Sequence, residues 1–377
     1  MIMKILLYST GELFGNKQTG GIKRFVELAK YLQNEYNADL CSADSSEVLH
    51  KNGLYESYHI KSVIVRSLRG LPPEARIAIK NRKIIKKIKS AGYDYIISFD
   101  VPPTISLCLF NVPNIVLMIR KDLIGYFDVT HKKKNLISSL KGMFLKVCES
   151  ICLKKSKRII TQCEYDKKRL LERHPLIAPK ISNKFAIQIN NVNPSWISNS
   201  FVKEEKKDGL YRICFIGNFN DSRKGHEIFL KSAQLLLKKY KNILFYIVGS
   251  GESENYYKKK YECERIIFLG HQVSPWEKLS MIDLNVVPSL ADSCPNTVME
   301  SLYFGVPVIG SDVGGIPEIL CDKQAIFKPN CNSIVEKIEM LINDTRSYEK
   351  LKENQLNRRV ELTFNWPQQI LDKICCD

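Results

Sequence analysis

Two carboxylates eight positions apart stand out among the residues that could bind a polyhydroxylated ligand. Asp292 follows an apolar stretch that predicts a strand, and Glu300 falls inside an otherwise apolar helix predicted over 296–304. A buried carboxylate needs hydrogen-bond partners, and sugar hydroxyls supply them. Asn296 and Thr297 stand where this helix begins and predict an N-terminal cap. The segment therefore indicates a sugar site, although acidic residues at this spacing also occur as solvated surface charges.

A polar loop with two cations follows another predicted strand. The sequence YRICFIGNFNDSRKGHEIF predicts a strand over 211–216, a loop that contains Asn218, Arg223 and Lys224, and a helix that opens near Gly225. Backbone N–H groups at a helix start and fixed positive charge both favour an anion, so this loop suits a diphosphate. The alternative is that Arg223 and Lys224 are only solvated surface charges.

Strands and helices alternate along both halves of the chain, which predicts an α/β fold with doubly wound parallel sheets. The first half is predicted to contain strands over 4–9, 39–41, 63–65, 95–99, 115–119 and 158–161, a helix that follows Gly20-Gly21, and helices over 74–90, 135–156 and 164–174. The second half is predicted to contain strands over 211–216, 243–248, 266–269, 284–287 and 306–310, and helices over 227–240, 275–281 and 296–304.

A polar, turn-rich stretch at 193–209, NPSWISNSFVKEEKKDG, separates the halves and predicts a linker. We therefore expect two Rossmann-like domains, over 1–200 and 201–377, that face each other across a cleft. In sheets of this kind, ligands bind outside the carboxyl ends of the strands.

Composition is that of a soluble α/β protein, with 44% hydrophobic and 26% charged residues among the 377. The start, MIMKILLYST, predicts a first buried strand rather than a signal peptide, so we expect a cytoplasmic location. The longest apolar stretch, 105–119, is interrupted by polar residues and is too short to cross a bilayer. The cysteines, 12 in number, are scattered without a Cys-x-x-Cys pair, so free thiols are expected rather than disulfides or a zinc site.

The net charge of +17 lies entirely in the first half of the chain. Residues 1–200 hold 33 Lys and Arg against 16 Asp and Glu, whereas residues 201–377 hold 24 of each sign. The segments 74–90 and 131–158 are especially basic and also carry regularly spaced apolar residues, as membrane-surface helices do. We expect them to face an anionic membrane surface or acceptor through Lys83, Lys86, Lys87, Lys132, Lys133 and Lys134. Because both segments belong to the predicted fold, we expect their apolar faces to lie in the core rather than on a membrane. The alternative for the lysines is that they only keep the protein soluble. No nucleic-acid-binding motif is present, so nucleic acid is not an expected partner.

Taken together, these segments resemble family 4 of the retaining glycosyltransferases, which have the two-domain GT-B fold. The Glu-x7-Glu motif of that family is similar to Asp292-x7-Glu300, and its Arg-Lys-Gly motif matches Arg223-Lys224-Gly225. Gly20-Gly21 before a helix and the stretch IITQCEYDKKRLL at 159–171 also match. The resemblance covers nearly the whole chain, and it implies that the last helix crosses back to the N-terminal domain.

The resemblance implies a role for each matching residue. The N-terminal domain, 1–200, would bind the acceptor and the C-terminal domain, 201–377, the nucleotide sugar. Lys224 and Arg223 would neutralise the donor diphosphate, Asp292 would bind the transferred sugar, and these three are the expected catalytic residues. The full set expected around the donor is Gly20, Gly21, Asn218, Arg223, Lys224, Gly270, Val273, Asp292, Asn296, Thr297 and Glu300. Within it, Glu300 would accept the ribose hydroxyls, and Gly270–Val273 would lie against the base. No metal or other cofactor is expected, because the sequence lacks the Asp-x-Asp motif that binds metal and diphosphate in the other glycosyltransferase fold.

Two departures from the family pattern affect these expectations. The first acidic position is Asp292 instead of Glu, which is shorter by one methylene group. Where many members have His-Asp after a central strand, this chain has Arg120, Lys121 and Asp122, and His131 is expected at the surface. The expected function is retaining, metal-independent transfer of a sugar, with a UDP-sugar favoured, to a lipid-linked or cell-surface polysaccharide or lipopolysaccharide precursor. The protein would act in the cytoplasm at the inner face of the membrane. The alternatives are a catalytically silent sugar-nucleotide-binding subunit and a nucleic-acid-binding protein.

Overall fold

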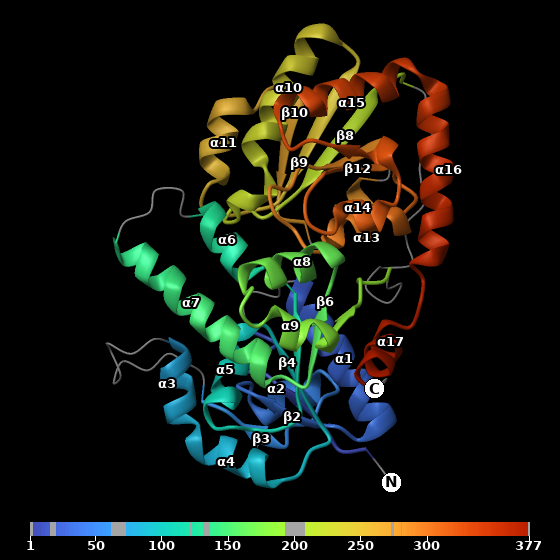
Figure 1. Ribbon diagram of the computed structural model, residues 1–377. Coiled ribbons are helices and arrows are strands. Elements are labelled where there is room, and N and C mark those ends of the chain that lie inside the picture. Colours follow the sequence, from blue (N-terminus) through green and yellow to red (C-terminus); the bar gives the residue numbers. More distant parts are fainter. Residues whose placement is uncertain are drawn as a thin grey trace. The chain divides into compact units, whose positions relative to one another are not determined.

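The structure, a computed structural model, describes residues 3–15, 20–61, 73–120, 122–130, 136–192, 208–272, 275–279 and 281–375 (Figure 1). The chain divides into two compact units. The first contains Met1–Phe127, Lys133–Gln188 and Asn365–Asp377, and the second contains Asp128–Lys132 and Ile189–Phe364. The final helix, α17 (Trp366–Cys375), therefore belongs to the first unit. Residues 193–207 of the expected linker lie outside the described residues.

The described strands of the first unit form one parallel sheet in the order β3-β2-β1-β4-β5-β6-β7. Their bounds are β1 (Ile5–Tyr8), β2 (Asp39–Ser42), β3 (Tyr58–His59), β4 (Tyr95–Phe99), β5 (Ile115–Ile119), β6 (Arg158–Thr161) and β7 (Phe185–Ile187). Every residue of β1 and β5 is buried, because helices cover both faces of a parallel sheet. The strand expected over 63–65 lies outside the described residues.

Helices connect these strands, and two of the sequence predictions for them need correction. Their bounds are α1 (Gly20–Tyr36), α2 (Ser46–Lys51), α3 (Pro73–Lys80), α4 (Arg82–Ser90), α5 (Val101–Leu109), α6 (Leu123–Thr130), α7 (Leu136–Lys155), α8 (Glu164–Arg173) and α9 (Ala178–Ile181). The single helix expected over 74–90 is wrong, because the chain breaks at Asn81, whose buried amide bonds the backbone of Lys61. Helix α5 was not expected; Pro102 and Pro103 occupy its first turn, where no backbone donor is needed.

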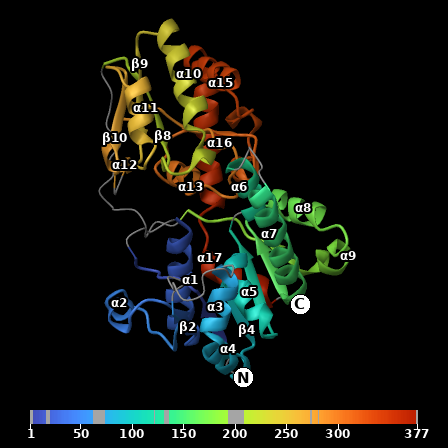
Figure 2. The same cartoon turned by 90° about the vertical axis from the view of Figure 1, so that its left-hand side faces the viewer.

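The described strands of the second unit repeat the order of β1 to β6 in the first unit. Its described strands form a parallel sheet in the order β10-β9-β8-β11-β12-β13. They are β8 (Tyr211–Ile216), β9 (Ile243–Val248), β10 (Ile266–Gly270), β11 (Leu284–Val287), β12 (Val308–Ser311) and β13 (Ile326–Phe327). The helices are α10 (His226–Lys239), α11 (Glu254–Tyr261), α12 (Pro275–Lys278), α13 (Asn296–Tyr303), α14 (Ile316–Leu320), α15 (Cys331–Asn343) and α16 (Thr345–Glu361). Helices α10 and α15 pack side by side against one face of this sheet (Figure 2).

Each sheet is doubly wound and has its own hydrophobic core. In the second unit Phe215 of β8 stacks on Phe229 of α10 with ring centroids 5.2 Å apart. The expected α/β fold with two doubly wound parallel sheets is confirmed. No described helix is long and apolar enough to span a membrane.

Candidate functional site

The chemistry-bearing residues of the second unit lie at the carboxyl ends of its strands. The strand order places a topological switch between β8 and β11, where the connections leave in opposite directions and leave room for a ligand. The loop after β8 carries Asn218, Arg223 and Lys224, and the segment after β11 carries Asp292. Residues 68 positions apart in the sequence are thereby brought to one edge of the sheet.

Lys224 and Asp292 form the central ion pair of this edge. The ammonium Nζ of Lys224 donates to Oδ2 of Asp292 at 2.6 Å, and the two side chains are 23% and 14% exposed. The backbone around Asp292 is tightly packed, because a Cβ at Gly314 would come within 1.8 Å of the Asp292 carbonyl oxygen. Gly314 also has φ +57°, a conformation that favours glycine. The pair is therefore held at a fixed place and remains reachable from solvent.

The loop that carries Lys224 is held by its own polar side chains. Asn218 Oδ1 accepts from the N–H of Asn220 at 2.8 Å, and Asp221 caps the short turn that leads to Lys224. Gly225 then adopts φ +77°, and a Cβ there would lie 1.9 Å from the carbonyl oxygen of Pro288. Only glycine allows this close approach, so the loop is anchored to the chain that follows β11.

Arg223 is engaged within the same loop. Its Nε and Nη2 donate to the two carboxylate oxygens of Asp221 at 2.9 and 2.6 Å, and its Nη1 donates to the carbonyl of Ala291 at 3.3 Å. Burial alone raises the pKa of the Asp221 carboxyl, but the hydrogen bond and charge of Arg223 outweigh it and hold that pKa below its ordinary value. Arg223 and Lys224 are therefore not freely solvated surface charges. The contacts of Arg223 with Asp221 and Ala291 stabilise the conformation of the loop.

An aromatic cluster packs against the loop that carries Lys224. The ring of His226, the first residue of α10, packs at a tilt against Phe219 with centroids 4.4 Å apart and stacks on Tyr257 of α11 with centroids 5.6 Å apart. Its ring hydrogen-bonds the backbone of Gly217, while its Nε2 is buried without a partner among the described residues. Burial lowers the pKa of His226 to about 4, so the ring is neutral near neutral pH. Sequence reasoning missed this residue, although its place beside the Arg-Lys-Gly motif was a usable signal.

Helix α13 begins beside Asp292 but without the expected cap. Asn296 and Thr297 lie inside the helix, and the residue before it is Pro295, which has no side chain that can cap. The cap prediction is therefore wrong, because Pro295 takes the extended conformation (φ −68°, ψ 121°) that a cap position requires. Among the described residues, no hydrogen bond engages the N–H groups of Asn296 and Thr297. Asn296 instead accepts from Asn190 Nδ2 at 3.3 Å.

Glu300 lies one turn into α13 and is half-buried. Its Oε2 accepts a hydrogen bond from Trp276 Nε1 at 3.2 Å. Trp276 belongs to α12 (Pro275–Lys278), is buried, and stacks on Phe304 with centroids 5.5 Å apart. The indole therefore fixes the orientation of the Glu300 carboxylate, a partner that the sequence did not indicate.

Gly270 ends β10 at the same edge of the sheet. It has φ +63°, and its carbonyl accepts from the N–H of Gly249 at 3.0 Å. The expected contact of the 270–273 loop with a base includes Val273, which lies outside the described residues.

In the first unit, Gly20 and Gly21 form the first turn of α1, and Arg120 follows β5. Arg120 binds Asp100, at the end of β4, through Nη2 at 2.6 Å and Nε at 3.1 Å. A Cβ at Gly21 would lie 2.4 Å from Arg120 Nη1, so the guanidinium lies against the start of α1. These four residues share the carboxyl edge of the first sheet, and Asp100 was not singled out from the sequence.

Asp122, which stands near the family's His-Asp position, is part of a network of mostly buried ion pairs. It accepts from Arg173 Nη2 at 2.6 Å and pairs with Arg169 Nε at 3.2 Å. Arg173 also binds Glu149, which in turn bonds His174 at 2.7 Å. These contacts join α7 and α8, so Asp122 stabilises the unit. Lys121 and His131 lie outside the described residues.

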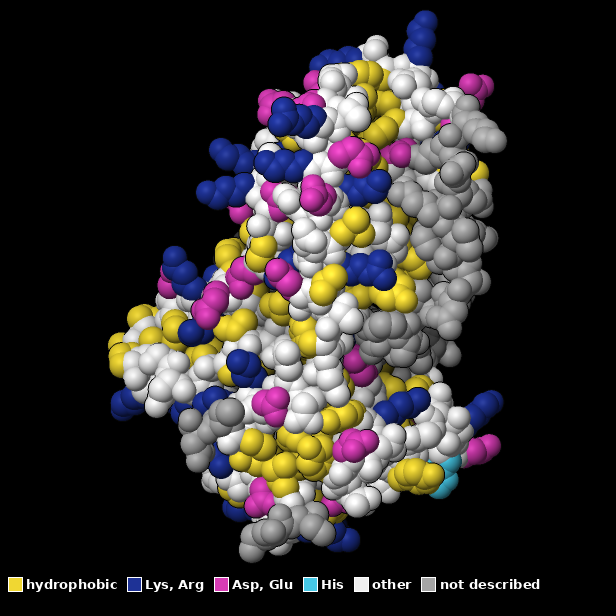
Figure 3. All heavy atoms as spheres, turned by 90° about the vertical axis from the view of Figure 1, so that its right-hand side faces the viewer, with side chains coloured by type: hydrophobic (Ala, Val, Ile, Leu, Met, Phe, Trp, Pro, Cys, Tyr) yellow, Lys and Arg dark blue, Asp and Glu magenta, His cyan; other side chains and the backbone are white. Residues whose placement is uncertain are grey.

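The expected basic face is only partly described. Lys83, Lys86 and Lys87 on α4 are exposed, while Ile85 and Ile88 on the other side of this helix are buried, so its apolar face belongs to the core. Lys132, Lys133 and Lys134 lie outside the described residues. On the face that Figure 3 shows, basic and acidic side chains are interspersed among the described residues.

Helix α7 differs from α4, because part of its apolar surface is open to solvent. Leu140, Met143 and Val147 are 53%, 61% and 52% exposed. Their spacing of three and four positions puts them on one side of the helix. The interpretation that the apolar face of this segment is all core is therefore wrong for these residues.

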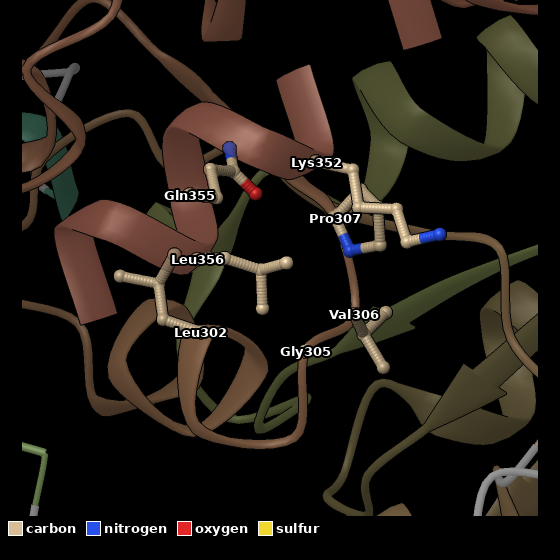
Figure 4. A pocket seen from close by; sticks show the side chains of 7 residues that line it. All are labelled: Leu302, Gly305, Val306, Pro307, Lys352, Gln355 and Leu356. Atoms are coloured by element: carbon tan, nitrogen blue, oxygen red, sulfur yellow. The ribbon is translucent and has the colours of Figure 1, made fainter. Parts of the chain in front are cut away.

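Two features mark the limits of the candidate site. No cluster of three or more His, Cys, Asp or Glu side chains that could hold a metal ion occurs among the described residues. A small hollow between α13 and α16 is lined by Leu302, Gly305, Val306, Pro307, Lys352, Gln355 and Leu356 (Figure 4). It lies at the amino end of β12, and Gln355 there bonds both backbone groups of Val308 at 2.8 and 2.6 Å. This hollow is at the edge opposite to the site and is a packing feature.

Comparisons with known proteins agree with this arrangement. Residues 197–358 match the family model described as glycosyl transferases group 1. Over 161 residues the chain is 27% identical to protein CapJ of Staphylococcus aureus, an alignment that covers 40% of each protein. It is 26% identical over 184 residues to the O-antigen biosynthesis glycosyltransferase WbnH of Escherichia coli, which covers 48% of this chain and 50% of the relative. The chain thus spans half or less of the length of these two relatives.

Solved structures share the fold. A sucrose-phosphate synthase from Thermosynechococcus elongatus has a TM-score of 0.75 at 16% identity, with 98% of both chains covered. Anabaena HepE in complex with UDP has a TM-score of 0.71 at 14% identity, with 99% of both chains covered. At these identities the likeness shows the fold alone.

Proposed function

We propose that this chain, a glycosyltransferase of the GT-B fold, transfers a sugar from a nucleoside-diphosphate donor, with a UDP-sugar favoured. The observation that carries the proposal is the Lys224–Asp292 ion pair at the carboxyl edge of the second sheet. A cation and a sugar-binding carboxylate side by side are what a sugar diphosphate requires. The UDP complex of HepE, a protein of the same fold, supports a nucleotide-sugar donor.

Each residue of the second unit then has a distinct part. Lys224 exchanges Asp292 for the donor diphosphate, and the released carboxylate accepts hydroxyls of the transferred sugar. The open N–H groups of Asn296 and Thr297 add donors for the diphosphate at the positive end of α13. Glu300, oriented by Trp276, accepts the ribose hydroxyls. Arg223 keeps the loop in place through Asp221, and Gly270 borders the base.

The proposed reaction retains configuration and proceeds on one face of the sugar. The bond between the anomeric carbon and the diphosphate oxygen breaks, and the acceptor oxygen bonds to the same carbon from the same side. The acceptor proton passes to the departing diphosphate oxygen. Lys224 stabilises the charge that develops on that oxygen, so no metal ion is needed for this purpose.

We propose a lipid-linked or polysaccharide precursor as the acceptor. WbnH, whose alignment covers about half of this chain, is an O-antigen biosynthesis glycosyltransferase. The exposed lysines of α4 and the exposed apolar stripe of α7 suit peripheral attachment to the anionic inner face of a membrane. That location would bring the enzyme to a lipid-anchored acceptor.

A thermal-shift screen across nucleotide sugars tests the donor proposal. A ligand at 100 times its Kd adds about 2.7 kcal/mol of stability, which raises the unfolding midpoint by several degrees. We expect one nucleotide sugar to stabilise the wild type and to have no effect on Lys224→Ala. If no nucleotide sugar stabilises the wild type, the proposal is wrong. Binding without any transfer or hydrolysis of the donor would instead identify the silent subunit.

A further inference from the structure

We infer that Arg120 binds an oxyanion of the substrate in the first unit, and that position 21 is glycine because the guanidinium of Arg120 occupies the adjacent space. This inference rests on the proposed function and extends it to a residue outside the family pattern. Arg120 follows β5, and its side chain is 25% exposed.

The guanidinium is fixed on two sides. Nη2 and Nε donate to Oδ2 of Asp100 at 2.6 and 3.1 Å, and the backbone N–H of Arg120 donates to Oδ1 of the same carboxylate at 2.9 Å. The guanidinium carbon also lies 5.0 Å from the ring centroid of Phe99. Asp100 itself adopts φ +64°, a strained backbone that persists at functional sites when its surroundings hold it. A surface arginine has no need of such anchoring.

One edge of the guanidinium stays open. Nη1 makes no hydrogen bond within the described part of the chain, whereas Nε and Nη2 are both used by Asp100. A guanidinium offers five N–H donors in a planar fork, and its free edge matches the oxygens of a phosphate or carboxylate. Asp100 thus orients the fork and leaves Nη1 for a ligand.

Local electrostatics favour an anion over a neutral hydroxyl. Nη1 lies against the first turn of α1, a helix of 17 residues with no acidic side chain in that turn. The amino end of a helix carries partial positive charge, so a guanidinium placed there is repelled unless negative charge compensates both. Asp100 supplies one negative charge, and a substrate oxyanion supplies the rest.

The absence of a side chain at Gly21 leaves room for the guanidinium of Arg120. A Cβ at position 21 would meet Nη1 at 2.4 Å and the guanidinium carbon at 3.0 Å. Gly21 lies in a helix with ordinary backbone angles, so alanine fits the backbone and only displaces the guanidinium. The glycine therefore makes room for Arg120, and the helix backbone need not approach the ligand itself.

A double-mutant cycle separates these roles. We expect Arg120→Ala to weaken substrate binding tenfold or more, and Gly21→Ala to have a similar effect while both variants stay folded. The double variant should then match Arg120→Ala, because the displaced group is already absent. If Gly21→Ala weakens binding as strongly in the Arg120→Ala background as in the wild type, Gly21 acts on the ligand directly and the inference is wrong.

Two arms identify the source of the oxyanion. The first measures the Kd of UDP and GDP by calorimetry without acceptor, and a tenfold loss in Arg120→Ala assigns the donor diphosphate. The second measures the acceptor KM for a polyprenyl-diphosphate-linked sugar and for the same sugar on an uncharged alkyl chain. If KM in Arg120→Ala rises only for the charged acceptor, the oxyanion that Arg120 binds belongs to the acceptor. No effect in either arm overturns the inference. Lys224→Ala, measured in parallel, shows the loss of nucleotide binding that is expected when the donor site of the second unit is damaged. A wild type that binds no nucleotide and transfers no sugar refutes the proposed function instead of this inference.

Discussion

Among single residues, Lys224 and Asp292 compensate each other's charge through their ion pair. A carboxylate 2.6 Å from the ammonium competes with any phosphate for the same donor. The second carboxylate, Glu300, accepts a hydrogen bond from the indole N–H of Trp276. Removal of the negative charge at Asp292 and at Glu300 should therefore have different effects on nucleotide binding and on transfer.

Replacing Asp292 by Asn should separate nucleotide binding from transfer. Because the competing carboxylate is gone, the affinity for free nucleoside diphosphate should stay the same or increase. Transfer should slow roughly tenfold to a hundredfold, since a hydrogen bond from a sugar hydroxyl to a charged group is worth about 1.5–3 kcal/mol. Calorimetry with nucleoside diphosphate and steady-state kinetics measure the two quantities. A nucleotide affinity that falls tenfold would contradict the assignment of Asp292 to the sugar.

Replacing Glu300 by Gln should have the opposite pattern. The loss of a charge-assisted bond to the ribose hydroxyls should weaken nucleotide binding by about 1.5–3 kcal/mol, or roughly tenfold or more in Kd. The matching 2′- or 3′-deoxy nucleotide should bind the variant and the wild type more equally. An unchanged Kd for the ordinary nucleotide would leave Glu300 as a structural partner of Trp276.

At the scale of elements, the loop between β8 and α10 depends on a buried neutral histidine. His226 has a folded-state pKa of about 4, below the ordinary value of 6.5. The unfolded chain therefore binds more protons between these values, and stability falls as the pH drops from above 6.5 towards 4. At pH 5 this difference amounts to about 2 kcal/mol by linkage.

We expect His226→Phe to reduce the acid sensitivity of the fold. Phenylalanine keeps the ring contacts with Phe219 and Tyr257 but has no group that titrates. The decrease in unfolding midpoint between pH 7 and pH 5 should be several degrees smaller in the variant than in the wild type. Equal decreases in both proteins would mean that His226 is protonated in the fold, contrary to its burial.

The elements could largely be predicted from the sequence, whereas their side-chain pairings could not. Strands β8, β9 and β11 match their predicted bounds, because apolar runs between turn residues are local signals. The helix over 74–90 failed at Asn81, whose partner Lys61 is 20 positions away. The pairing of Asp100 with Arg120, also 20 positions apart, depends on strand order. Exposure of Leu140 and Met143 was missed because periodicity does not say which apolar face is covered.

At the scale of the whole molecule, the one-sided charge predicts peripheral membrane attachment. Wild-type protein should co-sediment with anionic vesicles and only weakly with neutral ones. Binding to anionic vesicles should weaken at high salt, because charges of this kind are screened within about 8 Å already at physiological salt. Replacing Lys83, Lys86 and Lys87 by Gln should reduce binding tenfold or more, at about 1 kcal/mol per lysine.

The matched control replaces Lys238, Lys241 and Lys259 of the second unit by Gln and should bind like the wild type. Equal binding to neutral and anionic vesicles would assign attachment to the apolar stripe of α7, and no binding to either would return the lysines to a role in solubility.

Sugar transfer by the Lys224→Ala variant measures whether the cation at position 224 stabilises the leaving diphosphate. The assay follows release of nucleoside diphosphate from the stabilising nucleotide sugar in the presence of a lipid-linked acceptor fraction. Lys224→Ala should fold like the wild type and lose roughly a hundred- to thousandfold in turnover, as loss of a group that stabilises transition-state charge does. Lys238→Ala, an exposed lysine of α10 in the same unit, should retain full turnover. A folded Lys224→Ala variant that keeps more than about a tenth of wild-type turnover would contradict the account, because that cation would then not face the leaving diphosphate.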